Sequence, residues 1–385
     1  MIPSFADKPY AGRHLLRIAT YARDNNPFYR RWITDPENPP ILDRVTALAN
    51  NDDILNGHES TGTTSGSIGV PFRYAHSRQW RAVVAHDVKR FVNWLGGPVP
   101  TVRMLHDSSI RSAERHGADP MAIRVTTPID EQIDFTLRHV AESGAIAITT
   151  LPTNAELLAS AVLQRGIDMS AIRRFGTYAE TLEPHQKALI QAAFPNARLW
   201  STYSSMEFGM IAAMCPHEPD FYHLMAHRLG VEILLEDGTP APHGQPGAVY
   251  VTDYLNRLSP LIRYELGDLA VRGTCPCGKI KLPALSTVIG RVSGTIVNRS
   301  GQRVLFSEIS IGLREIPGIR QYQVIQDSIE HYQVKISCDR NIDTEVGDVF
   351  RRNLGYVPSE LTTEYVDSIP REPSGKFRTS ICRIQ

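Results

Sequence analysis

The chain has 385 residues, 42% of them hydrophobic and 21% charged, which is the composition of a globular protein. Its length predicts roughly two or three domains. Lysines and arginines number 41, as do aspartates and glutamates, so no bulk charge favours nucleic acid or an anionic membrane. The first residues lack the basic start and apolar core of a signal peptide, and no apolar run reaches the length of a membrane span. With five cysteines, an odd number, we expect a cytoplasmic protein with reduced thiols rather than a disulfide framework.

From residue 81 to about residue 200 the hydrophobic pattern alternates between helix and strand. Helices are expected at 81–95 and 155–164, the second ended by Gly166, and another helix begins near Pro184. Short apolar runs that predict buried strands lie at 145–148, 172–175 and 198–200. This alternation predicts a largely parallel sheet covered by helices.

After about Gly230 the pattern changes to strands joined by turns, with strands expected at 231–235, 248–252 and 261–264. Near the end of the chain, segments 322–325 and 332–336 predict paired strands, and 344–354 predicts a helix. We therefore predict an α/β protein with two domains. Residues 1–289 form a large N-terminal domain with a β-rich subdomain at 230–289, and residues 290–385 form a small α+β domain.

The most informative motif is the run of hydroxyls and glycines from Thr64 to Pro71, which reads T-S-G-S-I-G-V-P. Glycines let the backbone N–H groups approach an anion closely, and the hydroxyls add uncharged donors. A loop of this composition suits the phosphates of a nucleotide. Taken alone, however, such a cluster is more often a flexible turn.

Two carboxylates stand in contexts that suit a nucleotide site. Glu207 closes the segment Tyr203–Glu207 just after a predicted strand, where it could hold a Mg²⁺ ion that bridges phosphates. Asp268 directly follows Gly267, in a predicted turn after the strand at 261–264, and could accept both ribose hydroxyls. The alternatives are an ordinary loop glutamate and a common Gly-Asp turn.

Two basic residues are further candidates. Arg291 could pair with a phosphate or ribose oxygen, although an exposed arginine is the simpler interpretation. Lys376 lies on the loop P-R-E-P-S-G-K-F-R, which could carry it into a site as a mobile charge. The loop lacks the glycine and hydroxyl positions of a P-loop, and its alternative is a solvated basic tail.

A possible zinc site comes from cysteine spacing. Cys275-Pro-Cys277-Gly forms a knuckle whose two thiolates point to one spot, and Cys215 and His223 lie upstream. Three cysteines and one histidine complete a tetrahedral, closed zinc site. His217 and His227 compete with His223 for the fourth position, and isolated reduced cysteines are the alternative.

In this order, the motifs resemble those of the acyl-adenylate-forming superfamily, and more narrowly its phenylacetate–CoA ligase and coenzyme F synthetase branch. The loop at 64–71 matches T-S-G-[ST]-T-G-x-P with Ile68 for the second threonine. The segment 203–207 matches Y-G-x-T-E with Ser204 for glycine and Met206 for threonine. Residues 178–180 stand where the family has its adenine-contacting G-G-E or G-A-E turn. Segment 262–268 matches I-R-Y-x-x-G-D, and segment 374–376 matches the terminal S-G-K. The resemblance spans residues ~60–380, and Gly294 departs from it by standing where the family usually has a hinge aspartate.

The resemblance implies an enzyme that uses ATP and Mg²⁺ to convert a carboxylic acid into an acyl-adenylate, and then transfers the acyl group. The acceptor is CoA, a carrier protein or an amine, and a small, aryl acid is favoured. The C-terminal domain would be a lid. No nucleic acid or membrane partner is expected, and a homodimer is left open. The alternatives are an enzyme that adenylates a non-carboxylate substrate and a catalytically inactive nucleotide-binding relative.

The resemblance also implies residue roles. Lys376 and Glu207 would be catalytic, the first between the carboxylate and the α-phosphate and the second on Mg²⁺. The branch often carries a structural zinc, here held by Cys215, His223, Cys275 and Cys277. The predicted nucleotide-binding residues are Thr64, Ser65, Gly66, Ser67, Gly69, Ala179, Glu180, Tyr203, Ser204, Asp268 and Arg291. Candidates for the acid pocket are Trp80, Phe135 and His106, although aromatic residues at such positions are more often core.

Overall fold

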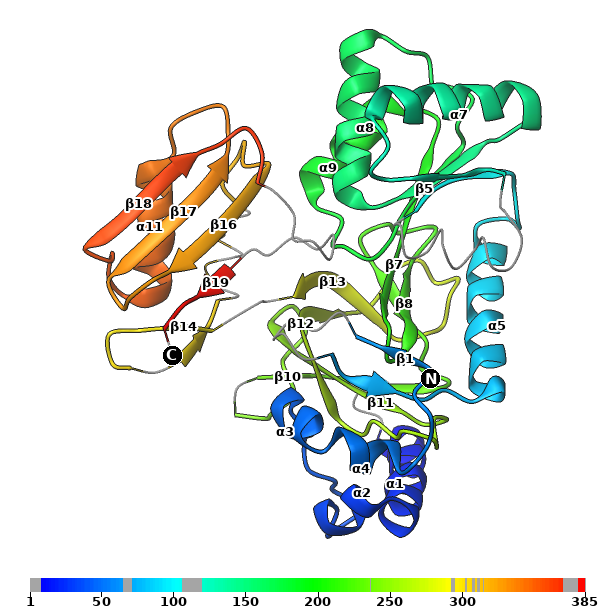
Figure 1. Ribbon diagram of the computed structural model, residues 1–385, viewed down its shortest axis with the longest axis vertical. Helices are drawn as coiled ribbons and strands as arrows, with labels where there is room; N and C mark the ends of the chain where they lie inside the picture. Colours follow the sequence, from blue (N-terminus) through cyan, green and yellow to red (C-terminus); the bar gives the residue numbers. More distant parts are fainter. Residues whose placement is uncertain are drawn as a thin grey trace. The chain divides into compact units, whose positions relative to one another are not determined.

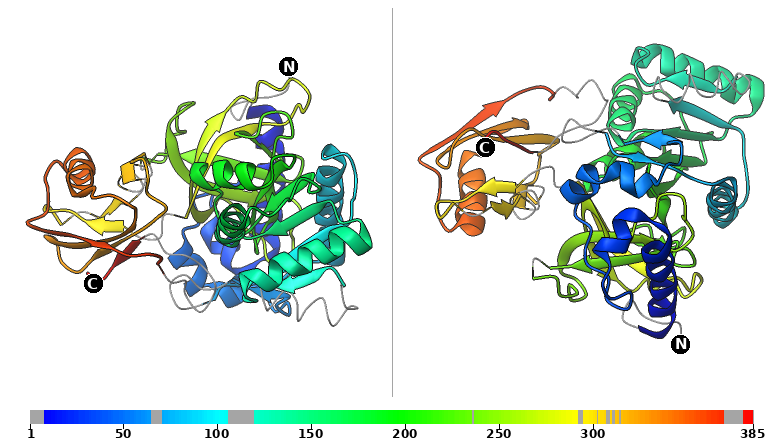
Figure 2. Two further views of the ribbon diagram at one scale, coloured as in Figure 1. Left: turned by 90° about the horizontal axis from the view of Figure 1, so that it is seen from above. Right: turned by 60° about the horizontal axis from the view of Figure 1, so that its bottom comes forward.

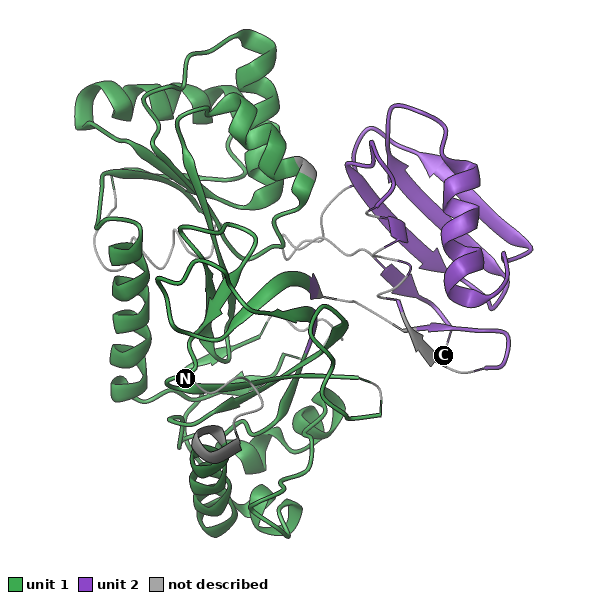
Figure 3. Ribbon diagram, turned by 180° about the vertical axis from the view of Figure 1, so that it is seen from behind, with its two compact units in different colours: residues 1–266, 270–289 green, residues 267–269, 290–385 purple. Residues whose placement is uncertain are grey.

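The computed structural model describes residues 8–64, 71–105, 120–235, 237–291, 295–301, 303–306, 309, 312–313, 315–369 and 380–384 (Figure 1). The chain divides into two compact units (Figure 3). The larger comprises Met1–Leu266 and Ala270–Ile289, and the smaller Gly267–Leu269 and Gly290–Gln385. No helix of the described part combines the length and the apolar character that crossing a membrane requires.

A mixed sheet of eleven described strands dominates the larger unit, in the order β10-β11-β12-β13-β9-β8-β7-β6-β5-β3-β4. Strands β3 to β7 are Thr101–Leu105, Ala122–Arg124, Ala147–Thr150, Arg174–Thr177 and Arg198–Ser205. Strands β8 to β13 are Gly209–Met214, Tyr222–Leu224, Leu229–Leu234, Pro246–Asp253, Tyr264–Gly273 and Ala284–Arg291. Neighbours from β4 to β7 run parallel, whereas the pairs β7–β8, β8–β9 and β9–β13 are antiparallel. The predicted parallel sheet and β-rich region are therefore two halves of one sheet.

The helices of this unit begin and end where local sequence signals act. Their bounds are α1 Lys8–Asn25, α2 Pro27–Trp32, α3 Arg44–Ala49, α4 Asn51–Leu55, α5 Arg78–Trp94, α7 Ile129–Ser143, α8 Pro152–Arg165 and α9 Pro184–Ala193. Pro184 opens α9 behind a capping box from Glu183, and Gly166 ends α8 with a positive φ of 61°. Helices α7, α8 and α9 pack next to one another beside the parallel strands, and α5 runs beside β8 (Figure 1). The α/β class predicted from the alternating pattern is confirmed.

Apolar packing joins the helices to the sheet in one core. Phe175 on β6 and Phe194 after α9 are fully buried, with ring centroids 4.8 Å apart. Phe91 on α5 is 2% exposed and makes an edge contact with Trp200 on β7. Each buried aromatic side chain removes a large apolar area from water, so these contacts fix the helices on the faces of the sheet.

Two short strands flank the hydroxyl and glycine loop. β1, Gly62–Thr63, pairs antiparallel with β2, Arg73–Tyr74. Thr64 extends this pairing, because its N–H donates to the carbonyl of Phe72 at 2.8 Å. Residues 65–70 lie outside the described part of the chain.

The smaller unit has its own core and a four-stranded sheet in the order β18-β17-β16-β19. The strands are β16 Gln321–Gln326, β17 His331–Ser337, β18 Glu360–Tyr365 and β19 Ser380–Cys382, with a separate hairpin of β14 Thr295–Val297 and β15 Arg303–Leu305. Helix α11, Asp343–Leu354, lies on one face of the sheet and buries Val346, Val349 and Phe350 (Figure 2). The strands predicted at 322–325 and 332–336 and the helix at 344–354 are confirmed.

Candidate active site and metal centre

The predicted ATP-contacting turn and the predicted Mg²⁺ carboxylate lie at one edge of the sheet. β6 and β7 are parallel neighbours, with Thr177 opposite Ser201. Residues 178–180 follow β6, and residues 203–207 run from the end of β7 into the next turn. The carboxyl ends of parallel strands form the edge at which open α/β sheets bind ligands.

Glu207 is the most distinctive residue of this edge. It is 2% exposed, in the turn between β7 and β8, and its Oε1 atom has no hydrogen-bond partner among the described residues. Burial raises the pKa of Tyr74, and the nearby charge of Glu207 adds to that rise. A buried carboxylate oxygen without a partner is costly unless a cation or donor meets it. This favours a ligand-binding glutamate over an ordinary loop residue.

The residues before Glu207 show an irregular strand end. The pairing of β7 with β8 shifts register between Tyr203 and Ser204. Tyr203 is 8% exposed, whereas Ser204 and Met206 are exposed. Irregularities of this kind often re-aim side chains next to active sites. β7 itself continues to Ser205, well beyond the strand predicted at 198–200.

The turn after β6 combines backbone strain with firm anchoring. Ala179 has a φ of 66°, a left-handed conformation that non-glycine residues rarely adopt and that is frequent at ligand sites. The Tyr178 hydroxyl donates to the carbonyl of Met104 at 2.7 Å, and burial, with the charge of Glu180, raises the pKa of Tyr178 to about 12. The Glu180 carboxylate accepts from the backbone N–H and the hydroxyl of Thr153, in the first turn of α8. Glu180 therefore holds the turn in place.

Thr64 anchors the base of the hydroxyl and glycine loop. It is 5% exposed, and its Oγ1 atom accepts from Phe72 N at 3.0 Å and from Arg44 Nη2 at 3.4 Å. The other predicted residues of this loop, Ser65, Gly66, Ser67 and Gly69, lie outside the described residues, as do His106, Gly294 and Lys376. For Arg291 the structure describes only the backbone, at the end of β13.

The structure corrects the prediction for Asp268. The strand predicted at 261–264 begins only at Tyr264, and β12 then continues through Gly267 and Asp268 to Gly273. Asp268 is thus a half-buried strand residue and does not occupy a turn. β12 starts later in the sequence than predicted because Arg263 adopts a φ of 47°. Two 3.0 Å hydrogen bonds from its guanidinium to Glu232 stabilise this conformation. Gly267 then takes a φ of 77° inside the strand without a steric penalty.

Three cysteines and one histidine come together in the antiparallel half of the sheet. The ligand atoms of Cys215, His223, Cys275 and Cys277 all lie within 4.8 Å of one another. Cys215 follows β8, His223 is on β9, and the two other cysteines lie in the turn between β12 and β13. His223 Nε2 is 3.8 Å from Cys277 Sγ, and Nδ1 is 3.2 Å from the carbonyl of Leu282. Since a carbonyl only accepts, Nδ1 carries the proton and Nε2 offers its lone pair to the cluster.

Burial sets the protonation of this cluster. It lowers the pKa of His223, which favours the neutral ring, and raises the pKa of Cys215 and, to about 12, that of Cys275. Burial also acts on Cys277, but hydrogen bonds from the backbone N–H groups of the residues that follow bring its pKa below the usual value. Of the competing histidines, His217 is exposed and His227 lies 2.8 Å from Asp87. Among the described residues His223 is therefore the histidine of the cluster.

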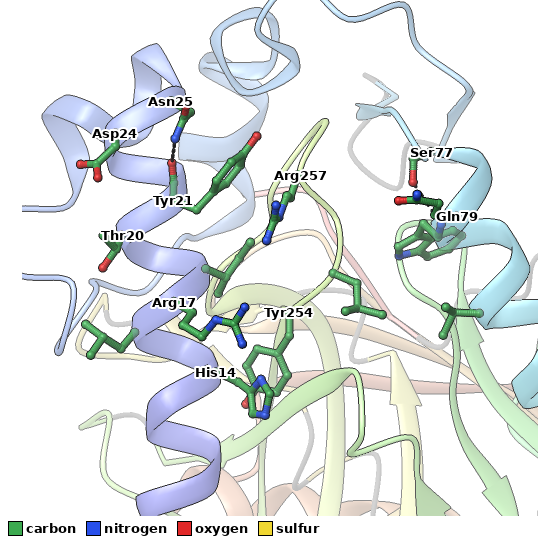
Figure 4. A pocket seen from close by; sticks show the side chains of 15 residues that line it. His14, Arg17, Thr20, Tyr21, Asp24, Asn25, Ser77, Gln79, Tyr254 and Arg257 are labelled. Carbon is green, nitrogen blue, oxygen red and sulfur yellow. Dashed lines mark hydrogen bonds between the residues drawn. The ribbon is translucent and has the colours of Figure 1, made fainter.

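The two described acid-pocket candidates are packed aromatic residues. Trp80 is 6% exposed, stacks on His76 and donates from Nε1 to Asp253 at 2.6 Å. Phe135 contacts His139 on α7, with ring centroids 4.4 Å apart. Trp80 also lines a cavity of about 840 Å³ between α1 and the start of α5, which His14 and Tyr254 border in Figure 4. None of the described residues predicted to bind nucleotide or metal lines this cavity.

Sequence reasoning overlooked His76 and Asp253, which connect to this edge. His76 Nε2 lies 2.8 Å from the backbone oxygen of Glu207, and Asp253 fixes the indole of Trp80. Burial lowers the pKa of His76 to about 4, and burial raises the pKa of Asp253. In the sequence, only the position of His76 pointed to this role: it lies five residues after Pro71 and directly before the serine that caps α5.

The fold, with a helix-covered mixed sheet followed by a small α+β unit, is that of the acyl-adenylate-forming ligases. Residues 296–382 match the family described as the CapK C-terminal domain. The chain is 22% identical to a phenylacetate–coenzyme A ligase of Thermus thermophilus, over 89% of this chain and 82% of the relative. The resemblance to the phenylacetate–CoA ligase-like branch that the motifs predicted is confirmed.

Solved structures agree on the fold. A 2-hydroxyisobutyryl-CoA ligase in the postadenylation state, in complex with R3-HIB-AMP, has a TM-score of 0.70 and 19% identity, over 99% of this chain and 90% of that one. The same ligase with 2-HIB-AMP and CoA, in the thioesterification state, has a TM-score of 0.60 and 19% identity, over 99% and 90% of the two chains. The amide bond synthetase McbA from Marinactinospora thermotolerans has a TM-score of 0.57 and 20% identity, over 80% of this chain and 66% of that one.

Proposed function

We propose that this protein uses ATP to convert a small carboxylic acid, with aryl acids favoured, into an acyl-adenylate, and then transfers the acyl group to CoA. The observation that carries the proposal is the buried carboxylate of Glu207, with its unpartnered oxygen, at the ligand-binding edge of the sheet. Its support is the similarity, over most of the chain, to a phenylacetate–coenzyme A ligase.

Glu207 would hold the Mg²⁺ ion that accompanies ATP. A hard anionic oxygen that protein donors leave unpaired fits this ion, which prefers oxygen ligands. When bound, the ion would offset the negative charge of the phosphates. The turn at 178–180 would contact the adenine, and Ser65, Gly66 and Ser67 would hold the distal phosphates.

Lys376 would place positive charge between two groups that repel each other, the attacking carboxylate and the triphosphate. In the first step the carboxylate oxygen forms a bond to the α-phosphorus, and the bond to pyrophosphate breaks. Asp268 would accept the ribose hydroxyls with help from Arg291. Replacing Lys376 by alanine should slow this step by about 10²–10³, which is ~2.7–4 kcal/mol of barrier.

CoA is the acceptor that we favour over an amine or a carrier protein. The two CoA ligases match over 89% and 99% of this chain, whereas the amide bond synthetase matches over 80% of it. The smaller unit, as a lid, would withdraw Lys376 after adenylation and admit the acceptor.

We further propose that Cys215, His223, Cys275 and Cys277 hold a structural zinc ion. Ligands at 2.1–2.3 Å from one tetrahedral ion are about 3.6 Å apart, close to the 3.8 Å between His223 Nε2 and Cys277 Sγ. A closed set of three sulfurs and one nitrogen leaves no position for substrate, so this ion would stabilise the fold and take no part in the reaction.

The test is ATP–pyrophosphate exchange against a panel of aryl and aliphatic acids, followed by acid-dependent consumption of CoA. We expect exchange with at least one acid, its loss in Lys376→Ala, and retention in the matched variant Arg378→Ala, two residues further along the chain. Exchange without any acid would favour a non-carboxylate substrate. Nucleotide binding without exchange for any acid would favour an inactive relative.

A further inference from the structure

His76 stands where three parts of the larger unit meet. It is 6% exposed, between β2 and α5. Its backbone N–H donates to Thr61 Oγ1 at 2.9 Å, beside the hairpin that carries the hydroxyl and glycine loop. Its ring Nε2 lies 2.8 Å from the carbonyl oxygen of Glu207. The next residue, Ser77, caps α5.

Two neighbouring aromatic rings fix the plane of the His76 imidazole. The ring of Trp80 lies 3.5 Å away at an interplanar angle of 7°, and the ring of Tyr74 lies 4.6 Å away at 36°. Trp80 is itself fixed, because its Nε1 donates to Asp253 Oδ2 at 2.6 Å. Asp253 is 1% exposed, and its other oxygen accepts two backbone N–H bonds. A chain of buried contacts therefore sets the direction in which His76 Nε2 points.

The bond from His76 to Glu207 has one polarity. A carbonyl oxygen has no proton to give, so Nε2 carries the hydrogen and donates it. The turn also has a hydrogen bond of its own, from Phe208 N to Ser205 Oγ at 3.2 Å. Gly209 behind it packs closely on α5, because a Cβ there would lie 2.8 Å from Val84 Cγ1. His76 thus adds a directed bond to the one residue of this turn whose carboxylate oxygen is left unpartnered in the described structure.

We propose that His76 is a positioning residue: its Nε2–H holds the peptide carbonyl of Glu207 and so fixes where the buried carboxylate meets a divalent cation bound with nucleotide. The inference rests on the function proposed above for Glu207. Metal ligands bind well when groups around them restrict their orientation. If His76 only filled space, a flat apolar ring in place of its imidazole would stack on Trp80 equally well.

Two variants of His76 separate donation from stacking. His76→Phe keeps a ring against Trp80 and removes the donor, whereas His76→Gln keeps an N–H donor at the same number of bonds from Cβ. Ile133→Ala serves as the control for general destabilisation, since Ile133 is a buried residue of α7 that is 2% exposed. The readout is the affinity of Mn²⁺ in the presence of a non-hydrolysable ATP analogue, followed by electron paramagnetic resonance, with thermal unfolding measured alongside.

We expect His76→Phe to weaken the apparent Mn²⁺ affinity about tenfold, as the loss of one buried hydrogen bond would. His76→Gln should restore the Mn²⁺ affinity to within about threefold of the wild-type value. Ile133→Ala should lower the unfolding temperature and leave the Mn²⁺ affinity unchanged. Wild-type affinity in His76→Phe, or an equal loss in Ile133→Ala, overturns the inference.

Exchange activity distinguishes this inference from the proposed function. If the wild type is active in exchange but His76→Phe binds Mn²⁺ as tightly as the wild type, the positioning role alone is refuted. A wild type that binds Mn²⁺ through His76 but exchanges with no acid refutes the proposed activation of a carboxylic acid alone. A wild type that binds no Mn²⁺ with the analogue overturns both.

Discussion

Two regions of the larger unit differ in how their polar groups are partnered. One is the sheet edge with Glu207, and the other is the cluster of Cys215, His223, Cys275 and Cys277. At the edge, one carboxylate oxygen is buried without a partner and Ala179 adopts a rare backbone conformation. In the cluster, the four ligand atoms face one another within 4.8 Å. Under the proposed function, the first arrangement would keep binding capacity for a ligand that is exchanged during turnover. The second would direct its binding capacity inward, toward a permanent structural ion.

Removal of a cluster ligand should affect stability most. In Cys277→Ser we expect zinc to be lost and the free energy of unfolding to fall by more than about 4 kcal/mol, because the folded state loses a bound metal. Metal analysis and denaturant unfolding of wild type and variant measure this. Cys338→Ser, which changes a thiol outside the cluster, is the matched control. A fully stable Cys277→Ser protein without zinc would mean that the cluster is not a structural metal site.

Glu207→Gln should show the reverse pattern. We expect pyrophosphate exchange to fall by about 10²–10³, or ~2.7–4 kcal/mol, since the carboxylate charge that would hold the cation under the proposed function is lost. Stability should stay the same or rise, because an unpaired buried charge disappears. Exchange assays and thermal unfolding of one preparation test both statements. If the variant were strongly destabilised and still active, the contrast between the two regions would fail.

Acid should weaken the packing around His76. The folded-state pKa of about 4 lies below the ordinary value of 6.5, so the folded state favours the neutral ring. The corresponding stability is present above pH 6.5 and is lost as the pH falls toward 4. Between pH 7 and pH 5 we expect wild type to lose about 2 kcal/mol more than His76→Phe. Urea unfolding of both proteins at the two pH values measures the difference, and parallel losses would contradict it.

Relief of backbone strain should give the smallest effect. Ala179→Gly should stabilise the fold by about 1 kcal/mol, because glycine adopts a φ of 66° without the steric cost that alanine has. A greater freedom of this turn should also raise the KM for ATP. Denaturant unfolding and exchange kinetics check the two effects. A less stable glycine variant would show that the Cβ of Ala179 makes a contact worth more than the strain.

Most of the fold was predictable where local signals and period agree. Gly166 and Pro184 mark helix ends that need no distant partner, and both lie where the sequence indicates. Strand ends were less predictable, because they depend on neighbouring strands. β7 continues to Ser205 while it pairs with β8, and the delayed start of β12 follows from the contact of Arg263 with Glu232.

The features of the candidate site also differ in whether the sequence predicts them. Motif order indicated Glu207, whereas cysteine spacing together with the upstream His223 indicated the four members of the cluster. The burial of Glu207 and the role of His76 could not be read from sequence. The role of His76 depends on its contact with the backbone of Glu207 and on the bond from Trp80 to Asp253, which join distant parts of the chain. The burial of Glu207 is a property of the folded unit as a whole.

β7 has a consequence for the dynamics of the site. This eight-residue strand pairs with β6 on one side and with β8 on the other, so it joins the parallel and antiparallel halves of the sheet. Amide hydrogens of a strand bonded on both sides exchange with solvent only through large openings of the fold. Glu207 follows the end of this strand by two residues. We therefore expect the segment that precedes its carboxylate to exchange slowly, and the position of Glu207 to persist through the local fluctuations that open surface loops.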